Sequence, residues 1–250
     1  MTATPLNKTA VVICIQEIEE DGSSLNLGNQ LTKEDLSFLH QAFVADSINN
    51  ALTLPDVDIK LFYSPKTETK KSVELILKYL KNRLTGEKKS TLEENRIEVS
   101  ELGPGRWGIK MDESFERCFK QGYEKVLFIG SRTPTLTHKM IQSAIDVLDK
   151  KDVAIGPTVE GRYYMLGFKG TYQIKLQEFD WKQPDIYSQV SSRLEALNLS
   201  WEEIQIWYAV EHPENIEYLA MDINQFRLTG DEETARETEK VLERILSRLS

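Results

Sequence analysis

The chain has 250 residues, of which 40% are hydrophobic and 28% are charged, proportions typical of a soluble protein with one substantial core. Its 31 basic and 40 acidic side chains give a formal net charge of −9 at pH 7, which repels nucleic acid unless positive charge is clustered. Since no apolar run approaches the roughly 20 residues of a membrane span and the first residues do not resemble a secretory signal, we expect a cytoplasmic protein with no nucleic-acid and no membrane partner.

Apolar runs of strand length alternate with segments of helical spacing along most of the chain. The clearest buried strand is expected at 125–131, and another buried strand at 8–16. Further strands are expected at 57–63, 96–102, 152–155, 163–168 and 203–210. Helices are expected at 32–54, 67–84, 112–122, 137–150, 183–197, 214–219 and 232–249.

Several of these helices have recognisable end signals. Thr32 is an N-cap candidate, with Asp35 three residues later as an imperfect capping box, and Pro55 ends the helix that follows. Asp112 is expected to cap a short helix that ends at Gly122.

The alternation predicts an α/β fold with a mostly parallel, Rossmann-like sheet and helices on both faces. We expect a single domain over 1–250 that includes an amphipathic C-terminal helix at 232–249, able to pack on its own sheet or within a homodimer. Ligands of such sheets bind beyond the carboxyl ends of the strands. Here these ends lie from residue 16 onward, at 130–132, at 156–162 and at 210–212.

Cysteines and histidines do not form a recognisable site in the sequence. Cys14 and Cys118 lack a CxxC partner, so we expect buried structural thiols. His40, His138 and His212 are scattered, and their spacing does not support a zinc site.

A series of motifs follows in order between residues 97 and 220. They are LG at 102–103 with KM at 110–111, IGSRTPTL at 129–136, GP at 156–157, EGRYYMLG at 160–167 and AVEHPENI at 209–216. This series resembles an uncharacterised family of GT-A-fold transferases that is related to nucleotide-diphospho-sugar transferases and nucleotidyltransferases. The resemblance implies a GT-A fold with a nucleotide-sugar or other anionic small molecule as ligand.

The chain departs from the family pattern where carboxylates would hold a divalent metal against the donor's diphosphate. Arg132 stands where the family has the aspartate of IGSD, and its guanidinium stays charged. The last motif has Ala209 and Glu211 in place of two aspartates, and the DGG motif has Glu160 and Arg162. We therefore expect degenerate metal-binding motifs and no metal, unless Glu160 and Glu211 suffice for Mg²⁺ or Mn²⁺.

The loop after the first strand shows the same departure. The family has a basic loop there that suits phosphates, whereas residues 9–32 of this chain contain no Lys or Arg. They contain Glu17, Glu19, Glu20 and Asp21, and such an acidic loop repels a triphosphate.

Glu160 and Glu211 are the candidate catalytic residues, as a general base, if the protein is active. The candidate ligand-binding residues are Gly103, Arg106, Lys110, Ser131, Arg132, Gly161, Arg162, Tyr164 and His212. Simpler alternatives remain open. Arg132 could pair with Glu160 or Glu211, and His212 could cap the following helix. The glycine-rich segment at 103–108 could be a lengthened turn, with Trp107 covering the core.

Three functions are compatible with this sequence. The first is a degenerate transferase-like protein that keeps an anionic ligand but has little or no metal-dependent activity. The second is an active glycosyl- or nucleotidyltransferase in which Arg132 and Arg162 replace the metal. The third is a non-catalytic interaction protein that uses its acidic surface and C-terminal helix.

Overall fold

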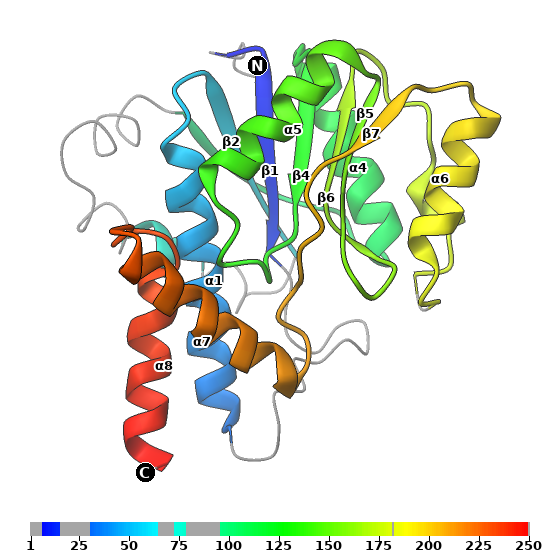
Figure 1. Ribbon diagram of the computed structural model, residues 1–250. Helices are drawn as coiled ribbons and strands as arrows, with labels where there is room; N and C mark the ends of the chain where they lie inside the picture. Colours follow the sequence, from blue (N-terminus) through cyan, green and yellow to red (C-terminus); the bar gives the residue numbers. More distant parts are fainter. Residues whose placement is uncertain (1–6, 16–30, 65–72, 79–95, 182, 250) are drawn as a thin grey trace.

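The computed structural model describes residues 7–15, 31–64, 73–78, 96–181 and 183–249. Seven strands in this part of the chain form one sheet in the order β3-β2-β1-β4-β6-β5-β7 (Figure 1). The strands are β1 (Thr9–Ile15), β2 (Val57–Tyr63), β3 (Ile97–Glu101), β4 (Lys125–Ile129), β5 (Val153–Pro157), β6 (Tyr163–Lys169) and β7 (Trp201–Glu203).

Six of the seven strands point in the same direction. β3, β2, β1 and β4 are parallel neighbours, and β7 is parallel to β5. β6 is antiparallel to both β4 and β5, so β5 runs parallel to β4. The carboxyl ends of all strands except β6 therefore meet at one edge, which we call the carboxyl edge, and the prediction of a mostly parallel sheet is confirmed.

The central strand β1 shows why its sequence is an uninterrupted apolar run. All seven of its residues are buried, because both faces of a central parallel strand are covered. Val11 and Ile13 face one hydrophobic core, while Val12 and Cys14 face a second core on the other side of the sheet.

The two cores lie under two pairs of helices (Figure 1). Helices α1 (Lys33–Leu52) and α5 (His138–Lys150) supply residues to the first core. Helices α4 (Trp107–Gln121) and α6 (Ile186–Ala196), with the short 3₁₀ helix η1 (Leu176–Glu178), supply residues to the second. The expected helices on both faces are thus confirmed.

A third apolar cluster joins α1 to the last two helices, α7 (Pro213–Leu228) and α8 (Arg236–Leu249). Leu39 and Phe43 of α1 meet Leu219 of α7 and Leu242 and Ile245 of α8. Figure 1 shows these three helices grouped beside the sheet, near its carboxyl edge. The C-terminal helix therefore packs on α1 and not directly on the sheet.

Several end signals in the sequence are confirmed. Thr32 is the N-cap of α1 and forms a capping box with Asp35. Gly122 ends α4 with a positive φ of 100°, which glycine adopts without strain. The thiols of Cys14 and Cys118 are free and buried, as expected.

The predicted start of α4 at Asp112 is wrong. The helix already begins at Trp107, and Asp112 is buried inside it. Its carboxylate accepts hydrogen bonds from the backbone N–H of Leu176 at 2.7 Å and of Gln177 at 3.2 Å, and from the hydroxyl of Tyr172. Asp112 therefore anchors the start of η1 against α4 and does not cap α4.

The predicted strand at 203–210 is also wrong. Strand β7 ends at Glu203, and beyond it the structure has an isolated bridge between Thr158 and Trp207. The sequence of this segment has the apolar residues of a strand, but the chain leaves the sheet to reach α7. Ile206, one of these apolar residues, is exposed.

Two predicted segments fall largely outside the described residues. Of the helix expected at 67–84, residues 73–78 are described and are helical. The acidic loop with Glu17, Glu19, Glu20 and Asp21 lies outside the described ranges. None of the helices in the described part of the chain has the length and apolar character that a membrane crossing requires.

Candidate functional site at the carboxyl edge

The segment between β7 and α7 runs across the carboxyl edge of the sheet. The backbone N–H of Trp207 donates to the carbonyl of Pro157 at the end of β5, at 3.1 Å. The N–H of Val210 then donates to the carbonyl of Arg132, just beyond β4, at 2.8 Å. The indole Nε1 of Trp207 donates to Thr135 Oγ1 at 3.0 Å. These hydrogen bonds fix the path of the segment from the end of β5 to the end of β4. They thereby place the predicted motif at 209–216 in the candidate site.

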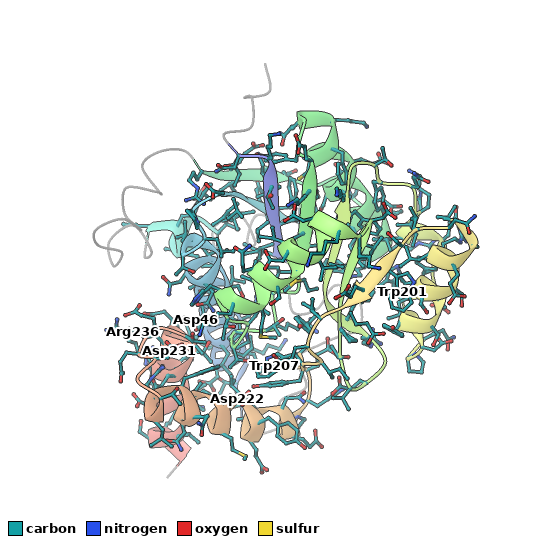
Figure 2. The ribbon with its side chains drawn as sticks, turned by 45° about the horizontal axis from the view of Figure 1, so that its top comes forward. Asp46, Trp201, Trp207, Asp222, Asp231 and Arg236 are labelled. Carbon is teal, nitrogen blue, oxygen red and sulfur yellow. The ribbon has the colours of Figure 1, made fainter. Side chains whose placement is uncertain are left out.

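Aromatic contacts attach this segment to α7. The rings of Trp207 and Tyr208 stack with centroids 5.5 Å apart, and Tyr208 meets Tyr218 of α7 edge to face. The hydroxyl of Tyr208 donates to Asp222 of α7 at 2.6 Å. Figure 2 labels Trp207 and Asp222, which lie close together where this segment passes α7.

Arg132 and Glu211 form an ion pair at this crossing. The distance from Arg132 Nη1 to Glu211 Oε1 is 3.6 Å, and the side chains are 12% and 34% exposed. Of the alternatives left open by the sequence, the pairing of Arg132 with Glu211 is therefore confirmed. Because Arg132 also accepts the N–H of Val210 through its carbonyl, it is joined to this segment through both backbone and side chain.

The residues after Glu211 begin helix α7. His212 is the N-cap residue, and Asn215 inside the first turn accepts hydrogen bonds from the backbone N–H groups of Glu211 and His212, at 3.0 and 2.8 Å. His212 thus occupies the N-cap position of α7, the simpler alternative for this residue. Its backbone position, and that of Glu211, are fixed by the buried Asn215.

Ser131 is contacted by a residue that the sequence analysis did not assign to the site. His40, on α1, is 8% exposed, and its Nε2 lies 3.4 Å from Ser131 Oγ. Burial, with a smaller contribution from the positive charge of Arg132, lowers the pKa of His40 from 6.5 to about 4, so its imidazole is neutral at pH 7. We refer to His40, Ser131, Arg132 and Glu211 as the Arg132 cluster.

The hairpin between β5 and β6 carries Glu160, Gly161 and Arg162 along the same edge. Gly161 has a positive φ of 77°, and a Cβ there would lie 2.9 Å from the carbonyl oxygen of Pro184, so the position requires glycine. Arg162 Nη1 donates to the carbonyl of Trp181 at 3.3 Å, and Glu160 is exposed in the turn.

The glycine-rich segment before α4 is tied to its own helix. The backbone N–H of Gly103 donates to the carboxylate of Glu113 at 2.8 Å. A phosphate-binding loop would instead point this N–H at the ligand. Arg106 donates to the carbonyl of Gln177 at 3.1 Å. Trp107 packs edge to face on Phe128, with centroids 5.5 Å apart, so this ring covers the core.

Lys110 and Tyr164 are both more buried than a ligand-binding role suggests. Lys110 is buried, and its Nζ lies 3.4 Å from Ser64 Oγ, just beyond β2. Tyr164 is 2% exposed, packs against Gly156 and donates its hydroxyl to the carbonyl of Gln205 at 2.7 Å. The side chain of Tyr164 is therefore part of the core, which corrects its expected place against a ligand.

The predicted site residues thus fall into separate groups. Ser131, Arg132, Glu211 and His212 come together at the ends of β4 and of the segment that crosses the carboxyl edge. Arg106 and Arg162 both bind carbonyls within 177–181, and Lys110 lies beneath the end of β2. In the described ranges, no group of three or more His, Cys, Asp or Glu side chains is placed to hold a metal ion.

Comparison with known proteins places this geometry in a family and a fold. The model of the family described as "Uncharacterized protein conserved in bacteria (DUF2064)" matches residues 47–183. A comparison with curated proteins found no match.

Solved structures share the fold over most of the chain. A protein from Desulfovibrio desulfuricans G20, provisionally named a nucleotide-diphospho-sugar transferase, is 19% identical with a TM-score of 0.72, over 96% of this chain and 99% of that chain. The 4-diphosphocytidyl-2C-methyl-D-erythritol synthase from Anaerococcus prevotii DSM 20548 is 12% identical with a TM-score of 0.54, over 87% and 96%. A CMP:2-keto-3-deoxy-manno-octonic acid synthetase complexed with CTP is 11% identical with a TM-score of 0.50, over 88% and 99%.

Proposed function

This chain belongs to the DUF2064 family of bacterial proteins and has the nucleotide-diphospho-sugar transferase fold, and from that premise we propose that it binds a nucleotide or a similar anionic small molecule and has little or no metal-dependent transferase activity. The ligand would bind at the carboxyl edge, beside the Arg132 cluster. This is the edge where open α/β sheets bind their ligands.

The ion pair between Arg132 and Glu211 is the observation that carries the proposal. Divalent cations of the Mg²⁺ type need several oxygen ligands. Here a guanidinium, which stays charged at any physiological pH, lies 3.6 Å from the carboxylate of Glu211. A positive charge built into the chain occupies the position where the family resemblance puts a metal ligand. These residues do not fit a divalent cation.

The same pair supports an anionic ligand. The side chain of Arg132 is 12% exposed and that of Glu211 is 34% exposed, so Glu211 is the partner that can turn toward solvent when an anion replaces it on Arg132. A phosphate can replace a carboxylate on a guanidinium because both fit its planar fork of donors. The structural neighbour complexed with CTP makes nucleotides the first class of ligand to test.

The proposal is tested by thermal shift with CTP, UTP, UDP-glucose and pyrophosphate, each with Mn²⁺ and with EDTA. We expect at least one ligand to raise the Tm equally under both conditions, since binding to the folded state alone stabilises it. Arg132→Ala should abolish the shift. Arg193→Ala on α6, which removes an ion pair with Glu178 of η1, is the matched control and should keep the shift.

Arg132→Asp provides the sharper variant, because it restores the carboxylate that the family motif has at this position. With two carboxylates at the crossing, we expect a ligand-induced shift that now requires Mn²⁺. A Mn²⁺-dependent shift in the wild-type protein, or release of nucleoside diphosphate from a nucleotide sugar that EDTA abolishes, would contradict the proposal.

A further inference from the structure

His40 is the one member of the Arg132 cluster that comes from a helix and not from the carboxyl edge itself. It lies on α1, 91 positions before Ser131, and its Nε2 is 3.4 Å from the serine hydroxyl. The imidazole is buried, whereas Ser131 is half-buried. An internal side chain of α1 thus contacts the hydroxyl of a half-buried residue.

Burial, aided by a neighbouring positive charge, keeps the imidazole neutral. Arg132, the residue after Ser131, is the charged group that acts on His40, and its positive charge disfavours a second one beside it. A neutral imidazole has one ring nitrogen that donates and one that accepts. The contact therefore has two possible directions, which are set by the tautomer of His40.

The two directions have opposite consequences for an anion. If Nε2 carries the proton, it donates to Ser131 Oγ, and the serine proton is free to point at a phosphoryl oxygen. If Nε2 is bare, the serine must give its only proton to His40 and would present lone pairs to the anion. Binding of an anion beside Arg132 is therefore compatible with the Nε2–H tautomer.

We propose that His40 is a positioning residue: as the Nε2–H tautomer it holds the Ser131 hydroxyl so that this hydroxyl and the Arg132 guanidinium together bind one phosphoryl group. This inference rests on the proposed function and adds to it a specific hydrogen-bond donor and its orientation. His40 itself does not contact the ligand.

The tautomer is measured without any ligand. Long-range ¹H–¹⁵N spectra of the imidazole rings distinguish Nε2–H from Nδ1–H, and the His40 signals are identified as those missing from His40→Gln. We expect Nε2–H at pH 7 and no protonation of His40 until the pH falls well below 6. An Nδ1–H tautomer overturns the positioning role even if the protein binds nucleotides.

Ligand binding is then measured by calorimetry with pyrophosphate and with CTP. His40→Leu, which removes the donor, should weaken binding about fivefold to tenfold, the usual effect of one lost hydrogen bond. His40→Gln retains an amide N–H donor and should recover most of the affinity. Exposed His138 provides the control, and His138→Leu should bind like the wild type.

A double variant separates positioning from a purely structural role. Because His40 acts through Ser131, the variant His40→Leu/Ser131→Ala should bind no more weakly than Ser131→Ala alone. Additive losses, or wild-type affinity in His40→Leu, would overturn the positioning role alone. If the wild-type protein binds neither probe, the proposed function fails together with it, whatever the tautomer.

Discussion

The carboxylate of Asp46, in the middle of α1, accepts hydrogen bonds from the backbone N–H of Thr238 at 2.8 Å and from its hydroxyl at 2.7 Å, although the two residues are 192 positions apart. The N–H of Glu237 donates to the same carboxylate at 3.0 Å. These donors belong to the first turn of α8, where backbone N–H groups lack partners within the helix. Asp46 therefore caps α8 from another helix, and Figure 2 shows it beside the segment that contains Asp231 and Arg236.

Replacing this cap should loosen α8. In Asp46→Asn one carboxylate oxygen becomes an amide nitrogen, which cannot accept a hydrogen bond from Thr238 or Glu237. We expect a loss of about 1–3 kcal/mol in the free energy of unfolding, from the lost cap and the buried donors left unpaired. Hydrogen exchange should accelerate in α8 while the amides of β1 stay protected. Asp56→Asn, at an exposed position, is the control and should leave both unchanged.

His40 should make stability depend on pH. Its folded pKa of about 4 is below the unfolded value of 6.5, so between these values the unfolded chain binds more protons. The contribution is fully present above pH 6.5 and is lost as the pH falls toward 4, by roughly 3 kcal/mol in total. Urea unfolding from pH 4 to 7 should show that His40→Gln lacks this loss.

Asp46 should make stability depend on pH in the opposite direction, over nearly the same pH range. Burial raises its pKa from 3.8 to about 7 against the lowering effect of its hydrogen bonds, so the folded protein binds the extra proton. Its contribution is therefore present at low pH and declines as the pH rises toward 7. In the wild type the two effects partly cancel. As the pH rises from 4 to 7, His40→Gln should become less stable and Asp46→Asn more stable. Profiles of stability against pH that run parallel in the two variants would refute this.

Gly108 should tolerate no side chain. A Cβ at this position would lie 2.5 Å from the carbonyl oxygen of Leu176 and 2.8 Å from Gln177 Cα, both backbone atoms that cannot turn aside. Although alanine favours helices, we expect Gly108→Ala to destabilise the protein by about 2–3 kcal/mol, since α4 and η1 must separate. In Gly130→Ala the new Cβ meets the carbonyl of Tyr164 at an ordinary 3.4 Å, so it should cost much less in the same thermal unfolding assay.

Asn215 should control the position of Glu211. Asn215→Ala leaves the N–H groups of Glu211 and His212 without their acceptor, and we expect a loss of about 1–2 kcal/mol in stability. Ligand affinity should change in the same variant, because Glu211 also pairs with Arg132. Asn224→Ala, at an exposed position of the same helix, is the matched control for both measurements.

Local signals in the sequence were sufficient for much of the fold. The bounds of β2 match the predicted 57–63, because a mostly apolar segment between Pro55 and a polar segment leaves little freedom. The capping box of Thr32 and Asp35 and the C-terminal Gly122 are also local features. Helix α7 is longer than the predicted 214–219. Its buried residues Asn215, Leu219 and Ile223 recur every four residues, a helical spacing that extends beyond the predicted end.

The misassignments come from contacts between distant parts of the chain. Helix α4 has Arg106 as its N-cap residue, and the Arg106 side chain makes no capping bond, so the start of the helix has no local signal. Asp112 looked like a cap, but its acceptors are used by η1. Nothing near His40 in the sequence indicates that it contacts Ser131, because that contact depends on how α1 lies across the sheet.

Arg132 contacts the segment that leads into α7 through both its backbone and its side chain. Its carbonyl and its guanidinium both bind the segment between β7 and α7. The hydrogen bond to the carbonyl of residue 132 does not depend on its side chain, whereas the ion pair with Glu211 does. An acidic residue at position 132 would bring two negative charges together where this segment meets the end of β4, unless a cation lay between them. Under the proposed function, the Arg132 side chain stands in place of a metal ligand and also attaches the segment that leads into α7.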